Sequence, residues 1–134
     1  ARYAPPADRL ARAAFAVSYY PGCVEARREG YRPVAPLLMM VGALDDWTPP
    51  QPCIALAQEV RRDNTGVSFD LEMFEGAYHG FDGTAPLRHR RDVPNGVNPG
   101  SGVHVGGHPP SRELSIQRLQ AFLDRFAPAP SAPR

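Results

Sequence analysis

Apolar residues along the chain fall into short runs that end at turn residues. The stretch AFAVSYYPG, residues 14–22, is rich in β-branched and aromatic residues and stops at Pro-Gly, which predicts a strand and a turn. Residues 34–42, VAPLLMMVG, are apolar at almost every position, the pattern of a strand covered on both faces in a parallel sheet. Residues 67–76 place apolar side chains at every second position from Val67 to Met73, which predicts a third strand with one half-exposed face.

Helical spacing of apolar residues marks two further segments. Residues 48–64 place Cys53, Leu56, Ala57 and Val60 on one face, with Thr48 as the expected N-cap and prolines near the first turn. Residues 111–126 begin with Ser111, the expected N-cap of a second amphipathic helix. The apolar stripe of that helix consists of Leu114, Leu119, Phe122, Leu123 and Phe126.

The remaining segments carry weaker patterns. Residues 7–13 are typical of the end of a helix, and the polar residues 24–33 predict a loop or a short helix. Residues 84–110 are rich in glycine and proline, which predicts a long loop that makes little core and packs over the ends of the strands or moves. Residues 127–134 have the composition of a disordered tail. Strands that alternate with helices indicate an α/β sheet, in one domain over residues 1–126.

Composition excludes several classes of function. The 134 residues have a formal net charge of +1, so charge does not indicate a nucleic-acid or membrane-surface partner. No run of 18 apolar residues could cross a bilayer. Cys23 and Cys53 do not have a metal-binding spacing; small buried thiols are expected, with a disulfide between them as the alternative. Localisation stays open, with the cytoplasm slightly favoured.

Two minor motifs are better explained as loop residues than as sites. His104 and His108 have the spacing of helical metal ligands, but the glycines between them argue against a helix, and we predict no metal site. The basic cluster at residues 88–91 is typical of a solvated loop, with an anchor for an acidic substrate as the less common role.

Acidic residues and a histidine follow the predicted strands. Asp45 and Asp46 come after the second strand, and His79 comes after the third. Functional groups of parallel α/β sheets lie beyond the carboxyl ends of the strands, so these side chains can be neighbours in space. A carboxylate that holds one imidazole nitrogen leaves the other free to transfer a proton to and from a nucleophile. The pattern therefore predicts a catalytic acid–histidine pair.

The same residues resemble the dienelactone hydrolase family of α/β-hydrolases, and specifically its C-terminal half. The matching pieces are YYPGC, PLLMMVGALDDWTPP and FEGAYHGFD, within residues 14–82, together with the final helix. The resemblance implies the C-terminal part of an α/β-hydrolase, with about three parallel strands and flanking helices. It also implies hydrolysis of a small ester or lactone without a cofactor or metal.

The resemblance also implies roles for individual residues. Asp45 falls on the triad acid and His79 on the triad base, whereas Asp46 falls on a variable position and is expected to face solvent or the helix start at Thr48. Tyr20, Trp47 and Tyr78 are candidate substrate contacts, and packing at the strand ends is the alternative for each.

The family's nucleophile has no counterpart in the sequence. No serine or cysteine stands in a Gly-x-[Ser/Cys]-x-Gly elbow, so the nucleophile is expected upstream of Ala1. Without it, the chain alone is expected to be marginally stable or self-associating, and inactive as an esterase. The alternative is a non-catalytic relic, or a module that completes a split hydrolase with a partner chain that carries the missing half.

Overall fold

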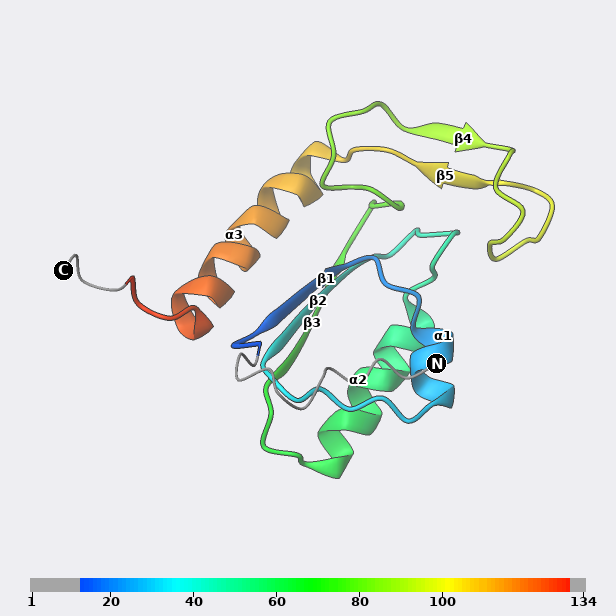
Figure 1. Ribbon diagram of the computed structural model, residues 1–134. Coiled ribbons are helices and arrows are strands. Elements are labelled where there is room, and N and C mark those ends of the chain that lie inside the picture. Colours follow the sequence, from blue (N-terminus) through cyan, green and yellow to red (C-terminus); the bar gives the residue numbers. More distant parts are fainter. Residues whose placement is uncertain (1–12, 131–134) are drawn as a thin grey trace.

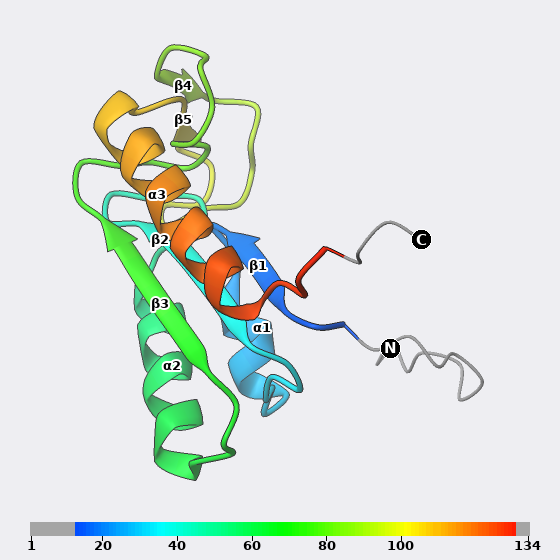
Figure 2. The same ribbon diagram turned by 90° about the vertical axis from the view of Figure 1, so that its left-hand side faces the viewer.

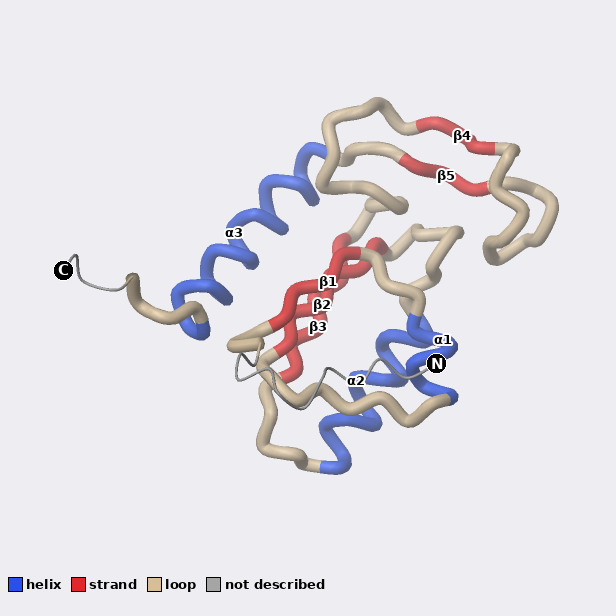
Figure 3. The backbone as a smooth tube through the Cα atoms, in the orientation of Figure 1, coloured by secondary structure: helices blue, strands red, loops and turns tan. Residues whose placement is uncertain are grey.

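A computed structural model describes residues 13–130 and shows three layers (Figure 1). A central sheet is covered on one face by helices α1 and α2 and on the other face by helix α3 (Figures 1 and 2). A small second sheet lies beyond one end of the central strands, as the tube in Figure 3 also shows. The predicted α/β architecture, with about three parallel strands and flanking helices, is confirmed.

The central sheet is formed by β1 (Ala16–Tyr19), β2 (Leu37–Gly42) and β3 (Phe69–Phe74). Its order is β1-β2-β3, and both neighbouring pairs are parallel. The chain returns to the start of the sheet through a helix between each pair of strands, as parallel pairing requires. All three carboxyl ends therefore lie at the same edge of the sheet.

Strand β2 is the buried centre of the domain. All six of its residues are buried, as its unbroken apolar run predicts. Residues Leu37, Met39 and Val41 face the core under α1 and α2, and Leu38 and Met40 face the core under α3. One strand thus joins both cores, and its carboxyl end is held rigidly.

Helices α1 (Cys23–Arg28) and α2 (Gln51–Asp63) follow β1 and β2. The polar segment predicted as a loop or short helix contains α1. The expected cap at Thr48 is wrong, because α2 begins after Pro50 and has no side-chain cap. Prolines near the first helical turn need no N–H partner, so the Thr48 hydroxyl is available for other contacts.

Helix α3 spans Pro109–Phe126 and begins after His108, so the expected cap at Ser111 is also wrong. Ser111 lies inside the first turn and contacts His108. Phe122 is buried against the sheet with Leu119 and Phe126 beside it, as predicted. The predicted apolar stripe wrongly included Leu114, near the start of the helix. Leu114 is 41% exposed, because α3 extends beyond the end of β3 there.

Strand β3 lies at the edge of the described sheet and is less covered than its alternation predicts. Phe69 and Phe74 are buried, whereas Met73 is 46% exposed. Two ion pairs join this edge to α3, with 3.6 Å between Arg118 and Glu72 and 3.7 Å between Arg125 and Asp70.

The segment predicted as a loop without strands over residues 84–110 contains a hairpin. Strands β4 (Arg88–Arg90) and β5 (Val103–Val105) pair antiparallel, and Val105 also forms a parallel bridge with His79. Each strand has only three residues, too few to give a strand pattern among the surrounding glycines and prolines. The hairpin does lie over the histidine end of the sheet, as predicted, but Val103 is fully buried and makes core there.

A disulfide joins Cys23 at the start of α1 to Cys53 in the first turn of α2. The prediction of two free thiols is therefore wrong. The sequence could not decide this, because 30 residues separate the two cysteines and only the parallel packing of the two helices brings them together.

Two predictions fall wholly or partly outside the described residues. The predicted helix end at residues 7–13 lies outside them, apart from Ala13. The predicted tail at 127–134 is described only to residue 130, and this part has no helix or strand beyond Phe126. Between residues 13 and 130, none of the helices has the length and apolar character needed to cross a membrane.

Candidate active site

The carboxyl ends of β2 and β3 bring the two predicted catalytic residues together. The turn after β2 runs against the loop after β3, with the Leu44 N–H donating to the carbonyl oxygen of Ala77 at 3.0 Å. At Gly42 the approach is so close that a Cβ atom would lie 2.5 Å from that same oxygen. Glycine at this position therefore allows the Asp45 turn to dock on the His79 loop.

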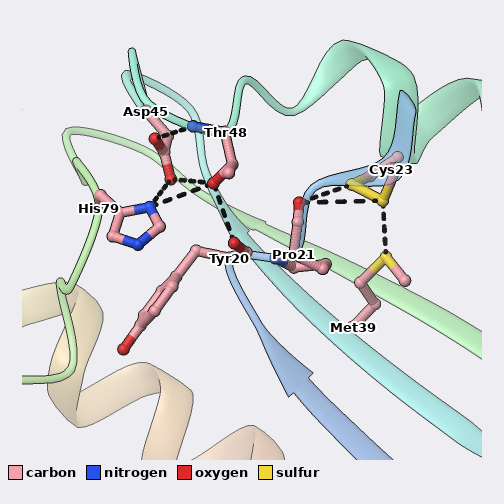
Figure 4. Close-up of a disulfide and its surroundings, with 8 residues drawn as sticks. Tyr20, Pro21, Cys23, Met39, Asp45, Thr48 and His79 are labelled. Carbon is pink, nitrogen blue, oxygen red and sulfur yellow. Dashed lines mark hydrogen bonds and ion pairs between the residues drawn. A yellow bond between two sulfur atoms is a disulfide. The ribbon is translucent and has the colours of Figure 1, made fainter. Parts of the chain in front are cut away.

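The Asp45 carboxylate is buried, and both of its oxygens have hydrogen-bond partners. Its residue is 3% exposed, and Oδ1 accepts hydrogen bonds from the backbone N–H groups of Trp47 at 2.9 Å and Thr48 at 2.8 Å. Oδ2 lies 3.0 Å from Nδ1 of His79 and 3.1 Å from Oγ1 of Thr48 (Figure 4). The predicted contact between Asp45 and His79 is thus present, and the turn's own backbone fixes the carboxylate's direction.

The His79 ring presents its second nitrogen outward. A carboxylate only accepts hydrogen bonds, so the contact with Asp45 assigns a proton to Nδ1. Within residues 13–130, Nε2 has no hydrogen-bond partner, and no buried side-chain nitrogen or oxygen in this part of the chain lacks one. Nε2 is therefore open, on a side chain that is 15% exposed. This is the arrangement of a histidine that can accept a proton from a nucleophile.

Two aromatic side chains enclose the imidazole. The ring of Tyr20 has its centroid 4.3 Å from that of His79, and the ring of Trp47 lies 4.6 Å away. Both residues were candidate substrate contacts, and the structure places both beside His79. Tyr20 reaches this position from the end of β1 with a φ of 39°, which a residue with a Cβ rarely adopts. Such strain is typical of residues held in place by a functional site.

The hydroxyl of Tyr20 is tied to the loop after His79. It donates a hydrogen bond to Oδ1 of Asp82 at 3.1 Å. Burial, together with the Asp82 charge, raises the pKa of Tyr20 to about 12, so the hydroxyl stays protonated throughout the neutral range. Tyr20 therefore acts here as a fixed wall of the site.

Asp46 has a different partner from the one predicted. It does not face the start of α2. Its Oδ1 accepts the backbone N–H of His104 at 2.8 Å, and Oδ2 lies 2.6 Å from Nδ1 of the same residue. Burial alone would raise the pKa of Asp46, but the hydrogen bonds from His104 outweigh it and lower that pKa.

Tyr78, the third candidate substrate contact, belongs to this second pair. Its ring centroid lies 4.9 Å from that of His104, and the His104 ring also stacks on His89 at 4.7 Å. The paired aspartates drew attention to Asp46 in the sequence. Its partner His104 could not be found in the same way, because it lies 58 residues away in a segment predicted as a loop. Thr48 was also missed as a site residue, because its position near the start of a helix suggested a cap.

The described residues contain no group aligned to act as a nucleophile on His79. Both cysteines are in the disulfide. Ser111 contacts His108, and Ser115 donates to the carbonyl oxygen of Arg112. Between residues 13 and 130 there is also no group of three or more His, Cys, Asp and Glu side chains placed to hold a metal ion.

The fold matches a solved esterase, whereas comparisons of sequence find nothing. No protein family and no curated protein matches this chain. The structure of a thermophilic esterase from the Planctomycetes species Thermogutta terrifontis, with propionate bound, superposes with a TM-score of 0.57 at 18% identity, over 95% of this chain and 50% of that one. The chain has the fold of part of an esterase. It spans about half the length of that protein.

A second structure of the Thermogutta terrifontis enzyme, esterase 2 phosphoramylated by tabun, overlaps less completely. Its TM-score is 0.48 at 18% identity, over 87% of this chain and 44% of that chain. Only the first superposition supports the argument about the fold.

Proposed function

We propose that this chain supplies the acid and the base of a catalytic triad in a hydrolase that cleaves carboxylic esters or lactones. The observation that carries the proposal is the Asp45–His79 pair at the carboxyl end of the sheet, with Nδ1 held at 3.0 Å and Nε2 open. The fold match to an esterase supports it. The resemblance of YYPGC, GALDDWTPP and FEGAYHGFD to the dienelactone hydrolase family favours that type of hydrolase.

The chemistry assigned to His79 is proton transfer in two stages. Nε2 accepts the proton of a serine or cysteine nucleophile as that group attacks the substrate carbonyl, and then gives it to the departing alcohol oxygen. In the second stage Nε2 accepts a proton from the water that attacks the acyl intermediate, and gives it to the serine oxygen or cysteine sulfur as the bond to the acyl group breaks and the carboxylic acid leaves. Asp45 stabilises the imidazolium that forms each time, and it keeps the ring oriented throughout.

The nucleophile in this proposal comes from residues outside the 134. None of the serines or cysteines in the sequence is flanked as a nucleophile elbow, and the cysteines are consumed by the disulfide. The chain matches only 50% of the solved esterase, so a whole enzyme of that type has room for an elbow elsewhere.

Small acyl groups are the first substrates to test. The rings of Tyr20 and Trp47 both lie against His79, which favours a flat or short acyl group beside the imidazole. The matching esterase was solved with propionate bound, which agrees with that size. Suitable probes are 4-nitrophenyl propionate and a dienelactone.

The test joins the chain to a polypeptide that carries a nucleophile elbow, beginning with the reading frame upstream of Ala1. We expect the joined protein to hydrolyse the aryl ester, and H79N to abolish turnover. H104N is the matched control, since it changes a histidine with the same kind of acid partner and should leave turnover within a few-fold of the parent. Activity that survives H79N would reject the proposal. Turnover by the 134 residues alone, above the H79N background, would place a nucleophile within them.

A further inference from the structure

The Thr48 hydroxyl contacts both members of the acid–histidine pair and also the backbone of Tyr20, which has no part in the triad. Its Oγ1 lies 2.9 Å from the carbonyl oxygen of Tyr20, 3.1 Å from Oδ2 of Asp45 and 3.1 Å from Nδ1 of His79 (Figure 4). It therefore contacts residues that follow β1, β2 and β3 at the same time. The side chain is free for this because α2 begins after Pro50 and takes no cap from it.

The proton count at this hydroxyl has one favourable solution. A threonine hydroxyl donates one hydrogen and accepts with two lone pairs. The carbonyl oxygen of Tyr20 and the carboxylate oxygen of Asp45 only accept, so one of them takes the hydroxyl hydrogen, and Tyr20 is the closer. A lone pair of Oγ1 then faces His79, and Nδ1 must carry the proton that lies between them.

The arrangement above leaves one pair of acceptors in contact without a hydrogen, Oγ1 of Thr48 and Oδ2 of Asp45, whereas the opposite arrangement leaves three such contacts. If the hydroxyl donated to Nδ1, the oxygens of Tyr20 and Asp45 would each lie within 3.1 Å of Oγ1 with no hydrogen between them. Nδ1 would also face the Asp45 carboxylate at 3.0 Å without a proton. All three contacts are repulsive in a part-buried site, where an unmade hydrogen bond is costly.

We propose that Thr48 is a positioning residue, whose hydroxyl holds His79 in the Nδ1–H tautomer and fixes the plane of its ring. The Nδ1–H is shared between two acceptors, Asp45 Oδ2 and Thr48 Oγ1, and two acceptors define a direction that one alone does not. The hydrogen given to the Tyr20 carbonyl also stabilises the strained backbone that places the Tyr20 ring on His79. An effect of Thr48 on catalysis rests on the proposed function, whereas its effect on the tautomer of His79 does not.

The first experiment measures His79 directly in the 134-residue chain, where no nucleophile is needed. Long-range ¹H–¹⁵N spectra at a pH where the ring is neutral should show the Nδ1–H tautomer. In T48V, which keeps the shape but lacks the hydroxyl, we expect the Nδ1 proton to exchange with water roughly tenfold faster and the Nε2–H tautomer to become detectable. T48S should behave like the parent, and T65V serves as a threonine control, because Thr65 lies between α2 and β3 at the opposite end of the sheet.

Two results overturn the proposal. One is an Nε2–H tautomer in the unmodified chain, which needs no variant and so covers the case in which T48V fails to fold. The other is a folded T48V whose tautomer and proton exchange match the parent.

The second experiment uses the joined hydrolase. T48V should lower kcat about tenfold with KM unchanged, and T48S should restore it, as expected of a group that acts through His79. An unchanged kcat in T48V would contradict the catalytic part. If no joined protein is active while T48V still alters the His79 spectra, the proposed function fails and the role of Thr48 in positioning stands.

Discussion

Two adjacent aspartates hold two different histidines, and the pairs share several features. In each, a carboxylate oxygen contacts Nδ1 of the imidazole: Asp45 that of His79 at 3.0 Å, and Asp46 that of His104 at 2.6 Å. In each, two aromatic rings lie within 5 Å of the imidazole centroid, namely Tyr20 and Trp47 for His79, and Tyr78 and His89 for His104. Contact geometry alone would therefore not distinguish them.

The pairs differ in what surrounds them. The Asp45 side chain is fully buried and that of His79 is 15% exposed, whereas those of Asp46 and His104 are 28% and 40% exposed. Asp45 is also fixed by two backbone N–H groups of its own turn and by Thr48. The first pair is thus preorganised by the sheet, and the second is partly screened by water.

The second pair has a structural role in the hairpin. Both the backbone N–H and the ring of His104 contact Asp46, and the carbonyl oxygen of Asp46 accepts the N–H of Val97 at 2.8 Å. Asp46 therefore anchors the segment that carries β5 to the carboxyl end of β2. Burial and rigidity, and not the contact distance, therefore separate the pair proposed for proton transfer from the pair that holds the hairpin.

The largest expected difference between the pairs is in catalysis. In the joined hydrolase, D45N should lower kcat on the order of 10³–10⁴-fold, because asparagine stabilises the wrong tautomer and no longer supports the imidazolium. D46N should stay within a few-fold of the parent. Comparable losses in both variants would show that the second pair also takes part in the reaction. The measurement is kcat and KM on 4-nitrophenyl propionate.

Removal of the disulfide should affect the first pair and spare the second. The disulfide lies against the Tyr20–Pro21 turn, because the sulfur atoms of Cys23 and Cys53 are 3.9 and 3.4 Å from the carbonyl oxygen of Pro21. It is far from the hairpin in sequence. C23S/C53S should lower the free energy of unfolding by about 2–4 kcal/mol, as is usual for a native disulfide. Below the unfolding transition, His79 resonances should shift or broaden and those of His104 should not. Equal changes at both histidines would mean that the disulfide supports the whole strand edge.

Much of the architecture could be predicted from the sequence, because burial on both faces leaves a strong signal. The apolar run at 34–42 and the helical spacing around Leu56 specified the centre of the sheet and α2. The contact between Asp45 and His79 followed from strand ends that must meet in a parallel sheet.

Three of the errors share a different origin, since they depend on contacts between segments distant in sequence. The His104 ring reaches Asp46 only after β4 and β5 pair, and Cys23 meets Cys53 only after α1 and α2 pack. Local patterns contain neither contact. Thr48 was misassigned because cap preference is local, whereas its actual partners follow three different strands.

Loss of each carboxylate should destabilise the fold to different extents. D45A leaves the N–H groups of Trp47 and Thr48 and the Nδ1–H of His79 without their acceptor, at an expected cost of about 1–3 kcal/mol in the free energy of unfolding. D46A should cost less, about 1 kcal/mol or below, because water can replace the lost contacts at a partly exposed site. Urea denaturation of both variants checks this, and a larger loss in D46A would reverse the proposed order of rigidity.

The smallest expected effect is the pH dependence of the second pair. Hydrogen bonds from His104 lower the pKa of Asp46 in the folded chain below its unfolded value of about 3.9. A carboxyl group with a depressed folded pKa contributes stability that is fully present above the unfolded pKa and is lost as the pH falls through the folded pKa. The free energy of unfolding of the parent should therefore fall more steeply below about pH 4 than that of D46N, by less than about 1 kcal/mol in total. Hydrogen exchange of the His104 backbone N–H, followed over the same pH range, should accelerate in the parent as Asp46 is protonated. The exchange rate could instead follow only the intrinsic pH dependence of amide exchange. The hairpin would then be held by β4–β5 pairing and the buried Val103, and Asp46 would contribute nothing to its docking.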